Sequence, residues 1–211
     1  MQTPFFFYKH EPYYLNRNLH RGVIGGHILI CHLPTKKDLE GLLPGKKDRK
    51  IAPPQEEDKI VIAYNKKLLS TLPPPDLVLT STWKRTIETA QQYGFIDAQE
   101  EPLLDELDFG PYAGEPRQDF LEEVGVQWFI NPKRTLIGPA VEVLEERVLS
   151  FLEKYSTYDC LLIFGQPFFS QALISYIRHG HIIGMNILSV KYNELIHLKV
   201  KKEDHEEDEK N

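Results

Sequence analysis

Four side chains of chemically useful types stand at informative places in this sequence. His32, Arg85 and Gln166 come at or shortly after the ends of short apolar runs, and Glu106 lies in an acidic stretch. An imidazole can act as a nucleophile, a guanidinium can hold anionic oxygens, and a carboxyl group can donate a proton. Each residue also has an ordinary interpretation: His32 as a hydrogen-bonded core residue, Arg85 as a helix cap, and Glu106 as part of a solvated loop.

The elements that would position these side chains alternate between strands and helices. The strand-like runs are HILICH (27–32), DLVLTS (76–81), DCLLIFG (159–165) and ELIHLKV (194–200). Helical spacing of apolar residues marks 56–72 (with Ile60, Tyr64, Lys67 and Leu68), 82–93, 141–152 and 168–177. This alternation predicts an α/β fold, a three-layer α/β/α sandwich with a mostly parallel sheet. Ligands of such sheets bind at the carboxyl ends of the strands.

The organisation along the chain predicts one domain with two tails. At 211 residues and 41% hydrophobic composition, the sequence can bury one sizeable core. We assign that domain to residues 26–200, an aromatic-rich N-terminal arm to 1–25 and an acidic, disordered tail to 201–211. The aromatic arm indicates either association with another chain of the same fold or packing against its own domain.

The charge balance excludes two partner classes. With 25 Lys and Arg against 31 Asp and Glu, the net charge of −6 gives no basic surface for nucleic acid and no cationic excess for a membrane. No stretch approaches the roughly 20 apolar residues of a spanning helix. Cys31 and Cys160 lie in apolar runs, which favours buried thiols in a reducing compartment, with a disulfide as the alternative. We therefore expect a cytoplasmic protein.

Five segments together resemble the histidine phosphatase superfamily, the phosphoglycerate-mutase-like fold. In chain order they are CHLPTKKDLEGLLPG, DLVLTS with TWKRTIETA, LLDELDFGPYAG, GPAVEVLEERVLSFLEK and LLIFGQPFFSQAL. The separation of 53 residues between His32 and Arg85 (85 − 32) is typical of that family. The resemblance covers roughly residues 26 to 200, and five motifs in order are specific for the fold.

This resemblance implies a role for each candidate residue. His32 is at the position of the nucleophile that forms a phosphohistidine, and Glu106 is at the position of the acid that protonates the leaving group. Arg85, Gln166 and Cys31 occupy phosphate-binding positions. The family's site works on small phosphorylated metabolites without a metal or another cofactor, so we expect neither here.

The sequence departs from the family at three positions. Cys31 replaces an arginine, Leu33 a glycine and Gln166 a histidine. Phosphoryl transfer depends on fixed donors around the transferred group, and losing one such donor costs about 10²–10³ in rate in comparable sites. We therefore expect a weakly active or non-catalytic chain that acts on small phosphomonoesters such as phosphoserine as a homodimer or a heterodimer with an active paralogue. The combination is similar to the non-catalytic subunit of a metal-independent phosphoserine phosphatase. The alternatives are an active stand-alone phosphomonoesterase and a phosphate-ligand sensor or scaffold.

Two other sequence signals are weaker. Arg178-His179-Gly180 has the family's signature tripeptide, but it closes a predicted helix in the last third of the chain. A cysteine phosphatase needs an arginine six residues after its cysteine, and positions 37 and 166 hold Lys37 and Gln166. The functional position is therefore predicted at Cys31-His32-Leu33.

Overall fold

A five-stranded sheet forms the centre of the computed structural model, which describes residues 24–45 and 49–201. The strands are β1 (Ile24–Cys31), β2 (Leu77–Thr80), β3 (Gln99–Glu100), β4 (Leu161–Gly165) and β5 (Leu195–Lys201). Their order is β3-β2-β4-β1-β5, and only the β1–β5 pairing is antiparallel. The four predicted strands are thus present, while β3 was not predicted.

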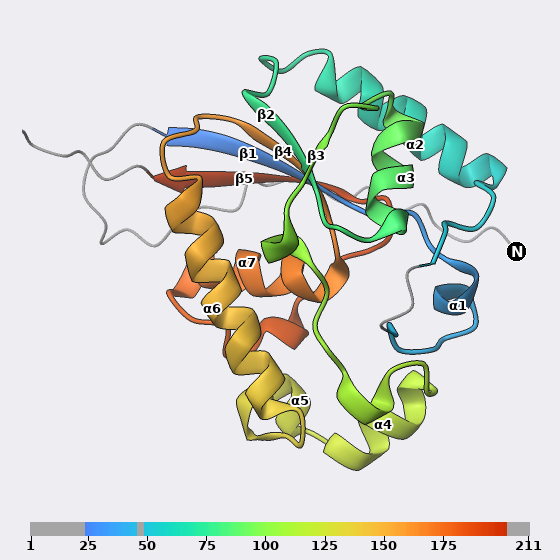
Figure 1. Cartoon of the computed structure of the whole chain (residues 1–211), viewed down its shortest axis with the longest axis vertical. Coiled ribbons are helices and arrows are strands. Elements are labelled where there is room, and N and C mark those ends of the chain that lie inside the picture. Colours follow the sequence, from blue (N-terminus) through green and yellow to red (C-terminus); the bar gives the residue numbers. More distant parts are fainter. Residues whose placement is uncertain (1–23, 46–48, 202–211) are drawn as a thin grey trace, which may run out of the picture.

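Helices cover both faces of the sheet. The α-helices are α1 (Lys36–Leu39), α2 (Glu56–Leu69), α3 (Lys84–Tyr93), α4 (Arg117–Val124), α5 (Gln127–Ile130), α6 (Gly138–Lys154) and α7 (Pro167–His179). The 3₁₀ turns are η1 (Pro102–Leu104), η2 (Gly110–Tyr112), η3 (Pro132–Arg134) and η4 (Met185–Ile187). Helices α2 and α3 lie above the sheet in Figure 1, and α6 and α7 lie below it. The predicted three-layer architecture with a mostly parallel sheet is confirmed.

The alternation of side chains along the strands divides the core into two layers. Ile28 and Ile30 of β1 pack with residues of α2 and α3, whereas Leu29 packs with α6 and α7. Because successive residues of a strand point to opposite faces, each apolar run supplies both layers. All five residues of β4 are buried, as expected for a strand covered on both faces.

The prediction for 56–72 was right about the helix and wrong about its face. Helix α2 buries Ile62 and Asn65, whereas Ile60 and Tyr64 are 62% and 54% exposed. Asn65 donates to the hydroxyl of Tyr93 at 2.8 Å and to the backbone oxygen of Asn193 at 3.1 Å. A buried polar anchor therefore decides the orientation of α2, and apolar spacing alone did not reveal it.

The signature-like tripeptide ends α7, as predicted. His179 is the last helical residue, and Gly180 adopts the left-handed conformation with φ of 74° that commonly stops a helix. The helix has 13 residues and is about 20 Å long, so the tripeptide lies one helix length away from Gln166, the residue that precedes the helix. This tripeptide is therefore a helix terminus.

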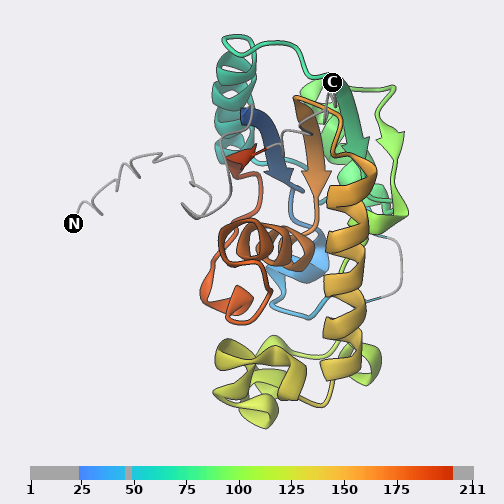
Figure 2. The same ribbon diagram turned by 90° about the vertical axis from the view of Figure 1, so that its left-hand side faces the viewer.

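The segment between Gly110 and Pro139 leaves the main body. It contains α4 and α5, which Figures 1 and 2 show beyond the sheet at one end of the molecule, beside the start of α6. The arm and the acidic tail predicted from the sequence lie outside the described residues, except for their innermost positions. Within the described ranges, no helix is both long and apolar enough to cross a membrane. Both cysteines are free; Cys31 is buried, and Cys160 is half-buried.

Candidate functional site

The carboxyl ends of three adjacent parallel strands bring the predicted residues together. His32 follows β1, Ser81 follows β2 and precedes the helix that carries Arg85, and Gln166 follows β4. Strands β2, β4 and β1 are neighbours in that order. The backbone N–H of His32 also donates to the carbonyl of Gly165 at 3.1 Å, which holds the ends of β1 and β4 in register.

His32 is buried and held in one orientation. The residue is only 1% exposed, and its Nδ1 lies 2.6 Å from the carbonyl oxygen of Leu33. A carbonyl oxygen only accepts, so Nδ1 carries the proton and Nε2 keeps its lone pair. Burial, together with the charge of Arg85, lowers the pKa of His32 to about 3, against an opposing effect of Asp38. The imidazole is therefore neutral at pH 7, as a nucleophile must be.

Arg85 brings a positive charge into the same buried space. Its Nε donates to Oε1 of Gln166 at 2.7 Å, and its guanidinium lies 4.4 Å from the centre of the Trp83 ring. The residue is 2% exposed, yet one terminal nitrogen, Nη2, is buried without a hydrogen-bond partner. A buried donor without a partner is costly and calls for an explanation. A bound anion would satisfy it.

Gln166 connects Arg85 to the end of β2. Its amide nitrogen donates to Oγ of Ser81 at 2.8 Å, and that hydroxyl lies 2.8 Å from Oγ1 of Thr86. Gln166, Ser81 and Thr86 are all completely buried. The sequence motif pointed to Gln166, whereas the part played by Thr86 became visible only in the structure.

Glu106 lies at the N-terminus of α7. Its Oε1 accepts from the backbone N–H groups of Leu107, Phe168 and Phe169 at 2.9, 3.1 and 3.3 Å. Burial raises its pKa, against the opposing effects of Arg85 and these three hydrogen bonds. A raised pKa favours the protonated carboxyl group that can act as a general acid. Glu106 thus has the environment of an acid rather than that of a solvated loop residue.

The loop that carries Glu106 is fixed by an arginine from α6. Arg147 donates to the carbonyl oxygens of Leu103, Asp105 and Glu106 at 3.1, 2.5 and 3.2 Å. These bonds fix the backbone of Glu106 and of the residues just before it against helix α6. Sequence reasoning missed Arg147, because nothing in the sequence links position 147 to a loop some forty residues earlier.

Cys31 and Leu33 flank His32 without adding a charge. Both are buried, and Leu33 packs in the core layer beneath α2 and α3. Burial raises the pKa of the Cys31 thiol well above its usual value, with a further contribution from Glu106, so the thiol is neutral. The site therefore combines a neutral imidazole, one guanidinium and one carboxyl group. That set can bind a phosphoryl group, with the guanidinium of Arg85 as its permanent cation.

Solved structures with a similar fold include phosphatases from varied sources. An α-ribazole phosphatase from Shigella flexneri aligns with a TM-score of 0.65 at 21% identity, over 83% of this chain and 94% of that one. A phosphoserine phosphatase mutant from Entamoeba histolytica gives 0.64 at 13% identity, over 82% and 89%. A mycobacterial glucosyl-3-phosphoglycerate phosphatase gives 0.64 at 12% identity, over 82% and 92%. At these identities the likeness establishes the fold alone.

The sequence itself matches a family. No curated protein sequence matches it significantly. The model of the histidine phosphatase superfamily (branch 1) matches residues 28–211, nearly the whole chain. With the fold and the arrangement at the strand ends, this match completes the assignment: the chain belongs to branch 1 of the histidine phosphatase superfamily.

Proposed function

We propose that this protein binds the phosphoryl group of a small phosphomonoester between His32 and Arg85 and hydrolyses it weakly or not at all by itself. The observation that carries the proposal is the buried guanidinium of Arg85, whose Nη2 has no partner, in the same space as a neutral His32. An anion in that space would accept from Nη2 and offset the cost of the buried charge.

Two substitutions support weak turnover. Position 31 offers a neutral thiol where the resemblance places an arginine, and position 166 offers an amide whose oxygen accepts from Arg85. In phosphoryl transfer, negative charge spreads over three oxygens, and donors fixed around them supply most of the acceleration. Without charged donors at positions 31 and 166, ground-state binding survives better than turnover.

The first experiment measures phosphate binding and hydrolysis separately. Titration calorimetry with inorganic phosphate should detect binding that Arg85→Met abolishes. Hydrolysis of phosphoserine and of a chromogenic phosphate ester should be far slower than that of an intact family member. Any residual turnover should disappear in His32→Ala and persist in the presence of a metal chelator. Turnover comparable to that of an intact member would refute the proposed weak activity, and no phosphate binding would refute the site.

A stand-alone phosphomonoesterase is the second candidate function. It is favoured by the preserved orientation of His32, with Nδ1 on a carbonyl oxygen, and by the raised pKa of Glu106. Rapid quenching during hydrolysis distinguishes it, because an active enzyme accumulates a phosphohistidine at position 32. If the phosphohistidine forms and is hydrolysed at a rate comparable to that of an intact family member, the second candidate replaces the first.

We further propose that the chain works in a complex with an active paralogue, with phosphoserine as the first substrate to test. The pairing rests on the sequence resemblance, and the choice of substrate also on the phosphoserine phosphatase among the structural relatives. Co-purification from the native source, followed by separate assays of the chain and the complex, tests both. A chain that binds phosphate but captures no related subunit would instead be a phosphate-ligand sensor.

A further inference from the structure

A cavity of about 390 Å³ lies beside the proposed phosphate site. Two residues line this cavity and also contact residues of the proposed phosphate site. Tyr192 lines the cavity, and its ring lies 5.3 Å from that of His32. Phe168 also lines it, and its backbone N–H donates to Glu106. The volume is typical of a small-molecule site, and its position suits the part of a phosphomonoester that lies beyond the phosphoryl group.

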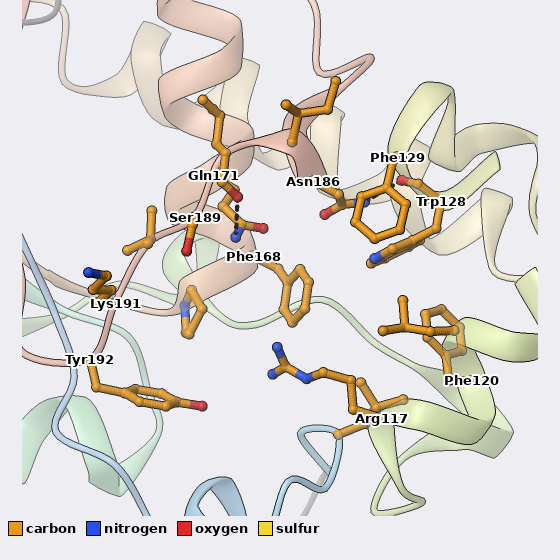
Figure 3. A pocket seen from close by; sticks show the side chains of 16 residues that line it. Arg117, Phe120, Trp128, Phe129, Phe168, Gln171, Asn186, Ser189, Lys191 and Tyr192 are labelled. Atoms are coloured by element: carbon orange, nitrogen blue, oxygen red, sulfur yellow. Dashed lines mark hydrogen bonds between the residues drawn. The ribbon is translucent and has the colours of Figure 1, made fainter. Parts of the chain in front are cut away.

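Aromatic side chains form much of the cavity wall. Phe120, Trp128 and Phe168 are buried. Phe120 and Trp128 meet edge to face with ring centres 5.0 Å apart, and the Trp128 and Phe168 rings are tilted by 60° with centres 5.8 Å apart. Phe129 continues the wall at the rim (Figure 3). Edge-to-face arrangements of this kind offer flat surfaces to a ring-shaped ligand. The wall therefore favours a planar, largely apolar group.

Two amide oxygens in the same wall have no hydrogen-bond partner. Gln171 donates its amide nitrogen to the carbonyl of Leu188 at 2.9 Å, and Asn186 donates its own to the carbonyl of Trp128 at 2.9 Å. Because carbonyl oxygens only accept, these bonds assign the nitrogen of each amide and leave Oε1 of Gln171 and Oδ1 of Asn186 as acceptors. Both oxygens are buried and unpartnered.

The two acceptors and the phosphate site lie on different sides of the cavity. Figure 3 shows Gln171 and Asn186 together on one side of Phe168, and Arg117 with Tyr192 on the other. The guanidinium of Arg117 is 5.8 Å from the centre of the Phe168 ring. Burial raises the pKa of Tyr192, and the charge of Arg117 opposes that effect. A cation thus marks the end near the phosphate, and hydrogen-bond acceptors mark the other.

We propose that this cavity binds the leaving group of the phosphomonoester, and that the group is a planar ring carrying hydrogen-bond donors directed at Gln171 and Asn186. This rests on the proposed function for its orientation, with the phosphoryl group toward Tyr192 and Arg117. A ring amine or ring N–H satisfies the two acceptors, whereas a purely apolar ring leaves them unpaired. Phe129 and Ile187, which are 40% and 74% exposed, are the exposed apolar residues of the wall.

The experiment compares two phosphate esters of equal shape. Titration calorimetry measures the dissociation constants of 3-aminobenzyl phosphate and 3-methylbenzyl phosphate, in which an amine replaces a methyl group of similar size. An apolar cavity alone would favour the methyl compound. We expect the amino compound to bind at least about fivefold more tightly, because its N–H groups pair with a buried acceptor. Equal affinity, or a preference for the methyl compound, overturns the inference.

Variants locate the preference. The double change Gln171→Met with Asn186→Leu removes both acceptors at similar volume and should abolish the preference for the amino compound. Inorganic phosphate should bind to this variant as it does to the wild type, which shows that it is folded. Gln118→Met, on the exposed surface of α4, is the matched control and should change neither measurement. A preference that survives in the double variant places its origin elsewhere and refutes the assignment.

The alcohols 3-aminobenzyl alcohol and 3-methylbenzyl alcohol separate this inference from the proposed function. They lack phosphate, so their binding, followed by ligand-observed NMR, reports on the cavity alone. If inorganic phosphate does not bind but the amino alcohol is preferred, the proposed function fails and the cavity assignment stands. If phosphate binds but neither amino compound is preferred, the reverse holds.

Discussion

Arg85→Met and Arg147→Met should affect stability and phosphate binding in opposite ways. Both substitutions remove a guanidinium and keep an unbranched apolar stem. Arg147 gives three hydrogen bonds to backbone carbonyls, whereas Arg85 gives one to Gln166 and leaves Nη2 without a partner. The first arrangement is that of a structural residue, and the second is that of a residue whose partner is a ligand.

The expected magnitudes follow from these contacts. For Arg85, one charge-assisted hydrogen bond contributes about 1.5–3 kcal/mol and the contact with Trp83 about 0.5–2 kcal/mol. Against them stand about 1–3 kcal/mol for the unpartnered buried donor and a further desolvation cost for the charge. The opposing contributions nearly cancel, so Arg85→Met should change the free energy of unfolding by no more than about 1–2 kcal/mol. Arg147 is half-buried, so solvent weakens each of its three charge-assisted bonds relative to that of Arg85. At about 1 kcal/mol each, they give a loss of about 3 kcal/mol.

Urea unfolding and phosphate titration test this pair together. Arg85→Met should retain stability and lose phosphate binding, whereas Arg147→Met should lose stability and, where still folded, retain binding. The His32 imidazole gives an independent readout by NMR, because removing the charge of Arg85 should raise its pKa. Strong destabilisation by Arg85→Met with unchanged phosphate affinity would show that Arg85 is structural and would refute the reasoning.

Three further predictions concern pH, repair and backbone space. The folded-state pKa of His32 lies near 3, below its unfolded value near 6.5, so the folded state excludes a proton that the unfolded state binds. Stability should therefore fall as pH drops from about 6.5 toward 3, by up to about 1.4 kcal/mol per pH unit. In acid titrations of unfolding, His32→Gln should flatten that slope. Cys31→Arg with Gln166→His should raise hydrolysis of a chromogenic phosphate ester far more than either change alone. Adding Leu33→Gly should cost about 2–5 kcal/mol of stability, since Leu33 is a buried core residue. A double variant that folds and binds phosphate but stays inactive would show that these positions are not the missing donors. Gly138→Ala should destabilise the fold by about 2 kcal/mol or more in thermal unfolding, because the added Cβ would overlap a backbone carbonyl oxygen; wild-type stability would show that the α6 start relaxes easily.

The strands could be predicted because burial on both faces leaves a strong local pattern. The run LLIF in β4 is apolar throughout, and the run in β1 is mostly apolar. The carboxyl ends of these two runs indicated the positions of Gln166 and His32 from the sequence alone. Strand β3 was not predicted because it has only two residues, both polar and exposed. Its position depends on pairing with β2, which is a tertiary contact that no window of sequence records.

The environment of the site could not be predicted in the same way. The family motif located Arg85 and Glu106, but the unpartnered nitrogen of one and the three backbone donors around the other depend on distances in the folded chain. The cavity is a stronger case. Arg117, Gln171 and Asn186 come from separate segments with no shared spacing, so their convergence is a property of the fold rather than of any motif.

The position of Gln166 between Arg85 and Ser81 also restricts how the sequence can change. Its oxygen accepts from Nε of Arg85, and its nitrogen donates to Ser81. A side chain at this position must therefore supply an acceptor to Arg85 and a donor to Ser81 at the same time, and a side chain that lacks either group leaves a buried polar atom without this partner. The glutamine thus couples the guanidinium to the end of β2, and the choice of residue at position 166 is linked to both of its neighbours.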